Sequence, residues 1–441
     1  MVQASPLFAR PTTTLSAWYA VSIFVVMFGF SFIDRLILSL LAPSIHEHLH
    51  ISDTQLGILF GMGFGVVYAL MGLPLAHLLD KHRRVPLVAA GVALWSLCTV
   101  ASGFAPNFLS LIFLRSGVAI GEAVLSPAVI SIIADLFPRD KRVLPTTIYT
   151  AVGAVMYTGA LVFGGLMFQL ATGMSASLGL EAWQITFVLV GLPGLLLAPL
   201  LLLTVPEPVR VGDIKAEEFA TVSQAWAYFR GERRLYGGLF LGAAAISICN
   251  SAKIAWVPTL LIRSHGMHPS QAGYMFGTVG LLSGFIGAIT WPSVVRFWTA
   301  RGRKDALITV FAIALTISWI CFGLVGFMRS LTFLFVAIGI GGFFSAALAV
   351  LVPILIQMVT PGRMRGRAMA LYLTATGLVG LGLGPPLAAL ISDQFFKGQF
   401  AIGYGLAALI FVTGPFASLA IWSIRGPYRT ALDKAEVLEE L

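Results

Sequence analysis

The sequence predicts an all-α polytopic membrane protein with twelve transmembrane helices in two six-helix bundles. The 441-residue chain is 58% apolar and only 11% charged, and its mean hydropathy is +0.91, whereas soluble domains are about 25% charged. Apolar runs of the roughly 20 residues that span a bilayer recur along the chain, and its two halves resemble each other. This composition excludes a soluble enzyme, a secreted disulfide scaffold and a disordered protein.

The apolar runs define twelve predicted spans that are joined by short loops. They cover residues 17–42, 54–79, 86–104, 108–134, 145–170, 183–204, 236–261, 271–295, 306–327, 332–358, 367–391 and 400–423. A long polar stretch divides them into six and six. We therefore predict an N-terminal bundle over 1–204, a cytoplasmic linker over 205–234, a C-terminal bundle over 235–426 and a cytoplasmic tail over 427–441.

The placement of the positive charges predicts the topology. The formal net charge is +9, and of the 28 lysines and arginines only Arg35, Arg115 and Lys253 lie in the interior of predicted spans, while Arg367 is the first residue of its span. Most of the others lie at the termini and in loops from even-numbered to odd-numbered spans. Cytoplasmic loops carry such an excess, so we expect a multi-pass protein of the inner membrane with both termini in the cytoplasm. The basic balance indicates contact with anionic lipids rather than nucleic acid. We expect a monomer.

Part of the linker shows helical periodicity. Phe219, Val222, Trp226 and Phe229 recur on one face, with charged residues on the others. This pattern predicts a short amphipathic helix. It is either a helix on the inner membrane surface or a plain connecting helix.

The two halves carry an internal repeat. Ser52–Gly61 corresponds to His268–Gly277, with Gln, Gly, Phe and Gly in matching places, and Tyr149 corresponds to Tyr372. A parallel repeat of six and six spans is typical of the major facilitator architecture, in which the substrate site lies between the halves near mid-membrane.

Five ionisable residues fall at membrane depth, where a charge costs several kcal/mol and usually faces a cavity or a partner. Helical rise places Asp34, Arg115 and Lys253 each about 12 Å from the outer end of its span. Glu122 lies two turns beyond Arg115 on the same helix face. We predict that Asp34 contacts Arg115 across spans 1 and 4, with Glu122 below them. Asp34, Glu122 and Arg115 are the candidates for proton coupling, and a static ion pair that locks two helices is the alternative.

This charged layer has an excess of positive charge when Asp34 is ionised, which favours an anionic headgroup as the substrate's polar end. The candidate substrate-binding residues are Arg35, Arg115, Glu122, Lys253, Asn250, Tyr149 and Tyr372.

Two segments carry a family resemblance. Phe32-Ile-Asp34-Arg35 in span 1 and Arg115-Ser-Gly-Val-Ala-Ile-Gly-Glu122 in span 4 resemble the motifs of Spinster-type transporters of the major facilitator superfamily. The resemblance implies that Asp34 and Glu122 are protonation sites with Arg115 as partner. It also implies that protons are the coupling ion, with no other cofactor, and that the substrate resembles a lysolipid or sphingolipid.

The loop after span 2 resembles the superfamily's gating motif. Asp80 opens this loop and Arg84 ends it, although Ala76 and Val85 depart from the usual pattern. Asp80 at a helix end is predicted to bridge to the basic start of span 11 and close the cytoplasmic side, and a solvated loop charge is the alternative. The candidate gating residues are Asp80, Arg84, Arg363, Arg365 and Arg367.

Together these features predict a proton-coupled secondary transporter that moves an amphipathic or anionic small molecule by alternating access. An organic-anion symporter and a drug exporter are alternatives within the class, and a passive lipid facilitator or scramblase is the alternative outside it. We expect no enzyme, because no catalytic constellation is present. We also expect no metal site, because His46, His48 and His50 lack a second group of ligands.

Overall fold

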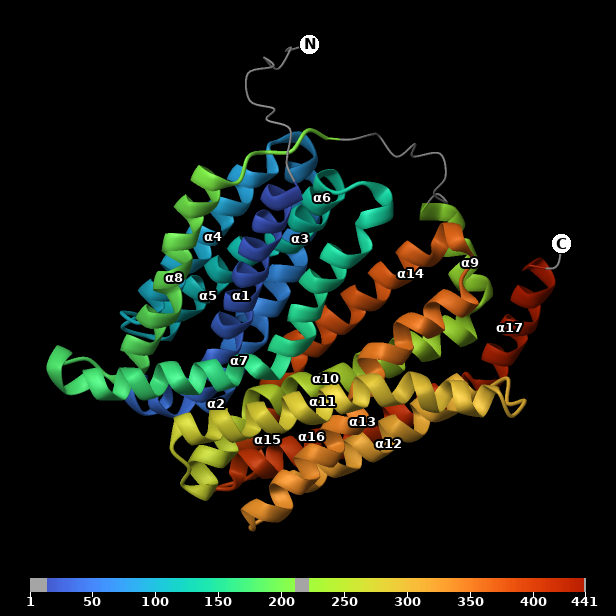
Figure 1. Cartoon of the computed structure of the whole chain (residues 1–441). Helices are drawn as coiled ribbons and strands as arrows, with labels where there is room; N and C mark the ends of the chain where they lie inside the picture. The colour runs from blue at the N-terminus through green and yellow to red at the C-terminus, as the bar shows by residue number, and fades with distance from the viewer. Residues whose placement is uncertain (1–13, 211–221, 440–441) are drawn as a thin grey trace. The chain divides into compact units, whose positions relative to one another are not determined.

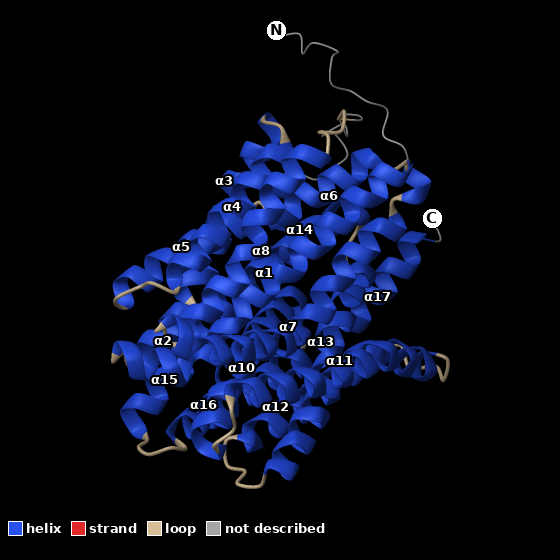
Figure 2. Cartoon of the chain, turned by 60° about the vertical axis from the view of Figure 1, so that its left-hand side comes forward, coloured by secondary structure: helices blue, strands red, loops and turns tan. Residues whose placement is uncertain are grey.

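The computed structural model describes residues 14–210 and 222–439. In this part of the chain helices are joined by turns and short loops, and no strand occurs (Figure 2). Twelve helical segments are long and apolar enough to cross a membrane, one for each predicted span. The predicted all-α polytopic fold class is confirmed.

The chain folds into two compact units (Figure 1). The first comprises Met1–Ile51, Met62–Gly212 and His268–Gly277, and the second comprises Ser52–Gly61, Asp213–Met267 and Thr278–Leu441. The helices of the first unit are α1 (Thr14–Leu49), α3 (Val67–Lys81), α4 (Arg84–Ser102), α5 (Phe108–Ala123), α6 (Leu125–Leu136), α7 (Val143–Leu178) and α8 (Ala182–Thr204), together with the π-helix η2 (Met62–Val66) and the short 3-10 helix η3 (Arg139–Lys141).

The second unit contains the remaining helices. They are α2 (Asp53–Phe60), α9 (Val222–Gly231), α10 (Arg233–His265), most of α11 (Pro269–Thr299), α12 (Ala306–Val325), α13 (Leu331–Val359), α14 (Gly362–Ala375), α15 (Gly382–Phe395), α16 (Ala401–Ser423) and α17 (Arg425–Glu439), together with the π-helix η5 (Thr376–Leu381).

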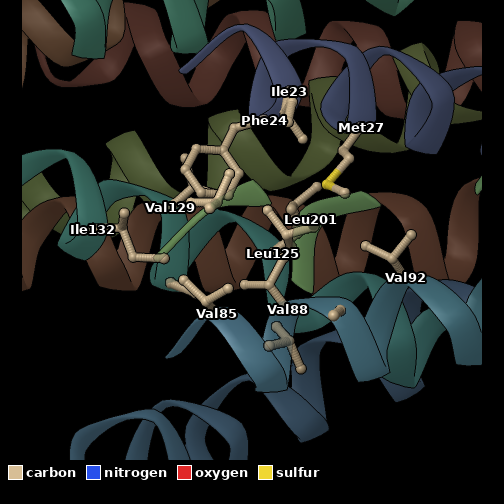
Figure 3. Packing of buried hydrophobic residues seen from close by; sticks show 14 of the residues in the cluster. Ile23, Phe24, Met27, Val85, Val88, Val92, Leu125, Val129, Ile132 and Leu201 are labelled. Carbon is tan, nitrogen blue, oxygen red and sulfur yellow. The ribbon is translucent and has the colours of Figure 1, made fainter. Parts of the chain in front are cut away.

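The core of the first unit is a cluster of apolar side chains, many of them from α1, α4, α6 and α8. Figure 3 shows Phe24 and Met27 of α1 facing Val88 of α4, Leu125 of α6 and Leu201 of α8. Phe24 and Leu201 are fully buried. This packing holds α1 against the helices that carry the other charged residues of the unit.

The longest helices exceed their predicted spans. Both α1 and α7 have 36 residues, and α1 continues through Pro43 to Leu49. α7 ends at Gly179, whose φ of 64° lies in the left-handed region, and α10 ends in the same way at Gly266 with φ 66°. Glycine adopts this conformation without a Cβ clash and commonly follows the last helical residue.

The repeated glycines of the two halves mark close helix contacts within each unit. A Cβ on Gly57 of α2 would lie 2.8 Å from the carbonyl oxygen of Pro385 in α15, in the second unit. A Cβ on Gly273 of α11 would lie 2.6 Å from the carbonyl oxygen of Leu161 in α7, in the first unit. The repeat therefore preserves positions at which two backbones touch.

Each unit also contains a π-helical segment whose backbone is supported from a neighbouring helix. In the first unit Ser116 of α5 donates to the carbonyl oxygen of Gly63 in η2 at 3.1 Å. In the second unit Ser247 of α10 donates to the carbonyl oxygen of Thr376 in η5 at 2.8 Å. Within a membrane such bonds satisfy polar backbone groups that a regular helix would pair internally.

Two short helices flank the spans of the second unit. α9 contains the described part of the predicted amphipathic segment, while Phe219 lies outside the described residues. Trp226 is 65% exposed and Phe229 is 7% exposed, with the Phe229 ring 4.8 Å from that of Tyr236. α17 begins at Arg425 and continues to Glu439, through most of the segment 427–441 that was predicted only as a tail.

Candidate functional site

A buried ion pair joins α1 to α5. The guanidinium of Arg115 donates through Nη1 to Oδ1 of Asp34 at 2.9 Å, and the two side chains are 1% and 2% exposed. Thr99 of α4 donates its hydroxyl to the other carboxylate oxygen of Asp34. The predicted contact between spans 1 and 4 is therefore present, and the hydroxyl from span 3 is an addition that the sequence did not indicate.

A second ion pair joins the same two helices. Arg35 donates through Nη2 to Oε2 of Glu122 at 2.7 Å, with Glu122 1% exposed. The Arg35 guanidinium also lies 4.6 Å from the ring centre of Phe64 and 5.2 Å from that of Tyr68. Such placement over aromatic faces stabilises a cation where water is scarce. The structure thus identifies Arg35 as the partner of Glu122, which the sequence placed only below the Asp34–Arg115 pair.

Helix geometry explains why the two pairs do not exchange partners. Neighbouring residues on a helix point about 100° apart, so Asp34 and Arg35 face different parts of α5. A backbone contact fixes the position of Glu122, because a Cβ on the adjacent Gly121 would lie 2.5 Å from the carbonyl oxygen of Gly91 in α4. α5 ends at Ala123, directly after the acidic residue.

Three polar atoms of these pairs have no hydrogen-bond partner among the described residues. They are Oε1 of Glu122, Nε of Arg35 and Nε of Arg115, all buried. Buried polar atoms nearly always form a hydrogen bond, so each of these three atoms needs an explanation. An oxygen of this kind can receive a proton, since a protonated carboxyl group no longer requires all of its acceptor bonds.

A chain of aromatic rings connects the charged pairs to Tyr149. The Tyr149 ring stacks on Phe28 at 4.6 Å, Phe28 contacts Phe32 at 5.1 Å, and Arg35 lies 5.3 Å from the Phe32 ring. Tyr149 is 1% exposed, and its hydroxyl lies 3.1 Å from that of Ser126. The first unit thus contains five of the residues predicted for proton coupling or substrate binding.

The second unit holds a separate polar group around Lys253. Its Nζ donates to Oδ1 of Asn250 at 3.1 Å, and the hydroxyl of Ser345 on α13 donates to the same oxygen at 3.1 Å. Lys253 is 6% exposed, lies 3.9 Å from the Phe322 ring centre, and forms no ion pair with a described residue. Tyr372, also predicted for the site, is 8% exposed and is not in this group.

The predicted gating residues fall into different environments. Asp80 is exposed at the end of α3, and Arg210 donates to its backbone carbonyl. Arg84 is not a loop residue but the buried first residue of α4, where it pairs with Asp135 at 2.5 Å and with Glu207 at 3.0 Å. This network connects the segment after α8 to α4 and α6. In the sequence, it could have been recognised from the charged residues at the ends of spans 3, 4 and 6.

The arginines before span 11 belong to the other unit, so their latch to Asp80 stays a prediction. Arg365 donates through Nε to the carbonyl oxygen of Thr360 at 3.0 Å, as Arg142 does to that of Phe137 at 2.9 Å. The internal repeat therefore preserves this contact. Nη1 of Arg367 is buried without a described partner, and the side chain of Arg363 lies outside the described residues.

No group of three or more His, Cys, Asp or Glu side chains that could hold a metal ion occurs within residues 14–210 and 222–439. The buried ion pairs of the site can bind anionic groups and take up or release protons.

Comparison with known proteins agrees with this architecture. The family model described as the Major Facilitator Superfamily matches residues 20–296. An efflux pump of Mycolicibacterium smegmatis is 28% identical over 94% of this chain and 94% of its own length. A sphingosine-1-phosphate transporter of Mus musculus is 25% identical, over 87% of this chain and 72% of its own length.

Solved structures give the same result. A bacterial homologue of the human lysosomal transporter Spinster, in an inward-facing and unoccupied conformation, superposes with a TM-score of 0.82 at 26% identity, covering 96% of this chain and 99% of that one. The xylose transporter XylE of E. coli has a TM-score of 0.64 at 14% identity, covering 92% of this chain and 96% of that one. The second likeness concerns the fold alone. The resemblance to Spinster-type transporters is confirmed.

Proposed function

Because the chain belongs to the major facilitator superfamily and is a multi-pass membrane transporter rather than an enzyme, we propose that it couples protons to the transport of an amphipathic anion by alternating access. The main support for this proposal is the presence of two buried ion pairs between α1 and α5. A proton on Asp34 or Glu122 cancels the charge that holds the facing arginine, so protonation changes the free energy of the contact between these helices.

Glu122 is the acid whose free oxygen supports this role most directly. Its Oε1 has no partner among the described residues while its Oε2 binds Arg35, so one carboxylate oxygen is available to a proton without loss of a hydrogen bond. Arg35 is 22% exposed at its side chain, and an anionic substrate can therefore compete with Glu122 for it. Substrate binding and protonation would then favour each other.

Lys253 supports an anionic substrate. A buried ammonium that binds only a neutral amide oxygen is poorly compensated, because desolvation of a charge costs several kcal/mol unless an opposite charge lies close. In the second unit this cation meets Asn250 and the Phe322 ring but no described carboxylate. A phosphate or carboxylate of the substrate would supply the missing charge.

An apolar pocket in the second unit supports an amphipathic substrate. It has a volume of about 440 Å³ and lies between the later part of α11 and α13. The apolar groups that line it come from Pro292, Val295, Thr299, Ala300, Leu351 and Ile354, and Arg296 is the charged residue of its wall. An alkyl chain fits such walls, since burying each methylene group contributes about 0.8 kcal/mol.

Transport in proteoliposomes tests the proposal. We expect the purified protein to accumulate radiolabelled sphingosine 1-phosphate in response to a proton gradient, and to transport the sugar acid glucarate much more slowly. Asp34→Asn and Glu122→Gln should abolish gradient-driven accumulation while retaining exchange of substrate across the membrane. Asp140→Asn, which changes an exposed carboxylate of the 3-10 helix η3, is the matched control and should behave as the wild type.

Two results would contradict the proposal. Full gradient-driven accumulation in both Asp34→Asn and Glu122→Gln would exclude these acids as coupling sites. Wild-type flux of sphingosine 1-phosphate that equilibrates without responding to the gradient would indicate a passive facilitator instead.

A further inference from the structure

A polar cavity of about 470 Å³ lies in the second unit, outside the charged groups described above, where the loop between α11 and α12 meets α17. Six charged residues contribute to its wall, namely Arg303, Lys304, Asp305, Arg425, Arg429 and Asp433. Three of them belong to the loop between α11 and α12, and three belong to α17. The cavity therefore forms only when α17 packs beside this loop.

An apolar face holds α17 in place. Tyr428 is fully buried and Leu432 is 8% exposed, and the Tyr428 hydroxyl lies 3.8 Å from the sulfur of Met358 in α13. Arg425 and Arg429 lie one helical turn apart, beside this apolar face, and both contact Asp305 of the loop. Their guanidinium groups are held toward the loop by a rigid helix.

The charges of the cavity do not balance. Arg425 and Arg429 both donate to Oδ2 of Asp305, the latter at 2.9 Å, so one buried carboxylate serves two arginines. Lys304 pairs with Asp433 at 2.8 Å. Arg303 forms no ion pair with a described residue. Among the described residues that line the cavity, four are cations and two are carboxylates, which favours the binding of an anion.

The aromatic residues beside the loop indicate that the cavity lies at the membrane surface. Arg303 lies 4.9 Å from the Trp298 ring centre, and Arg301 lies 3.6 Å from that of Phe297, which is 53% exposed. These rings end α11, a span of high hydropathy. Aromatic and basic residues at the end of a span lie at the level of the lipid headgroups.

We propose that this cavity binds the phosphate group of an anionic membrane phospholipid, with Arg303 and Arg429 as its principal donors. Arginine binds phosphate through two parallel N–H groups. A cluster of basic residues beside a span and on an amphipathic helix is the arrangement that recognises anionic headgroups. The inference does not depend on the transported substrate, because its residues lie outside both charged groups described above.

Lipid retention by the full-length protein tests this inference. The protein is placed in nanodiscs of phosphatidylcholine with a minor fraction of phosphatidic acid, and retained lipid is counted by native mass spectrometry. Each surface arginine contributes about fivefold to anionic lipid affinity, so Arg303→Gln/Arg429→Gln should weaken retention about 25-fold. The matched control is Arg301→Gln, an arginine of the same loop outside the cavity, which should weaken retention about fivefold at most, as expected for one surface charge. An equal loss in the control would show general attraction to the surface and overturn the site.

A gain-of-binding variant separates binding from folding. The Lys304–Asp433 pair is exposed, with both side chains 58% exposed, so Asp433→Asn should leave the fold intact and strengthen retention about fivefold. Weaker or unchanged retention would overturn the inference. A parallel experiment adds millimolar inorganic phosphate to the same nanodiscs. If phosphatidic acid stays bound, the site binds the phosphate group of a lipid. If inorganic phosphate displaces phosphatidic acid, the assignment to a lipid is overturned.

Discussion

The buried pair between Arg115 and Asp34 makes a quantitative prediction about stability. Arg115→Met leaves Asp34 with the Thr99 hydroxyl as its remaining partner, at a position that is 2% exposed. Removing one member of a buried pair costs about 3–5 kcal/mol, whereas replacing both members by apolar residues is often neutral. The double variant Arg115→Met/Asp34→Leu should therefore recover most of the stability that the single variant loses.

Thermal unfolding in a neutral detergent measures this difference. One kcal/mol corresponds to about 2–4 °C for a folding unit of 150–250 residues, so the single variant should unfold roughly 6–20 °C below the wild type. Lys304→Gln removes a cation from an ion pair with both side chains 58% exposed and should cost at most about 1 kcal/mol. If the double variant unfolds at the temperature of the single variant, the unpaired carboxylate is not the cause and the reasoning is refuted.

Three further predictions concern other positions. Gly121→Val should lower transport at least tenfold in the proteoliposome assay, because a Cβ at this position would lie 2.5 Å from the carbonyl oxygen of Gly91. The control is Gly366→Val, at a helical glycine with open space around it. Equal loss of transport in both variants would contradict this prediction. Lys253→Met should raise the KM for an anionic substrate about 10–100-fold, since a hydrogen bond to a charged group contributes about 1.5–3 kcal/mol. The conservative variant Lys253→Arg should raise the KM less. An unchanged KM in Lys253→Met would exclude Lys253 from substrate binding. Burial raises the pKa of Asp305, but hydrogen bonds from Arg425 and two neighbours outweigh it and hold this pKa below its ordinary value of 3.8. The stability that Asp305 provides is thus present above pH 3.8 and is lost as the pH falls through the lower pKa that Asp305 has in the folded protein. Below that pKa, wild type and Asp305→Asn should unfold at the same temperature. A difference that persists at such low pH would contradict this prediction.

Much of the architecture could be predicted because it follows from properties of single helices. Span positions follow from apolar length, and the depth of Asp34 and Arg115 follows from a constant rise per residue. Their contact is present in the structure. The glycines shared by the two halves were visible as a pattern, although their purpose as points of backbone contact was not.

Partner choice could not be predicted in the same way. The Arg35–Glu122 pair depends on how α1 is rotated against α5, and Thr99 is one hydroxyl in an apolar span, a weak signal. Arg84 belongs to the sequence of a gating loop but is buried in α4.

By itself the sequence determined how many helices cross the membrane, which charges lie within them and which half repeats the other. These are local consequences of hydropathy and helical periodicity. Only the tertiary structure decided that Arg35 holds Glu122, which oxygen of Glu122 stays without a described partner, and that α17 docks to form a basic cavity. Those outcomes depend on the rotation and packing of helices that lie far apart in the chain, for which no local pattern carries information.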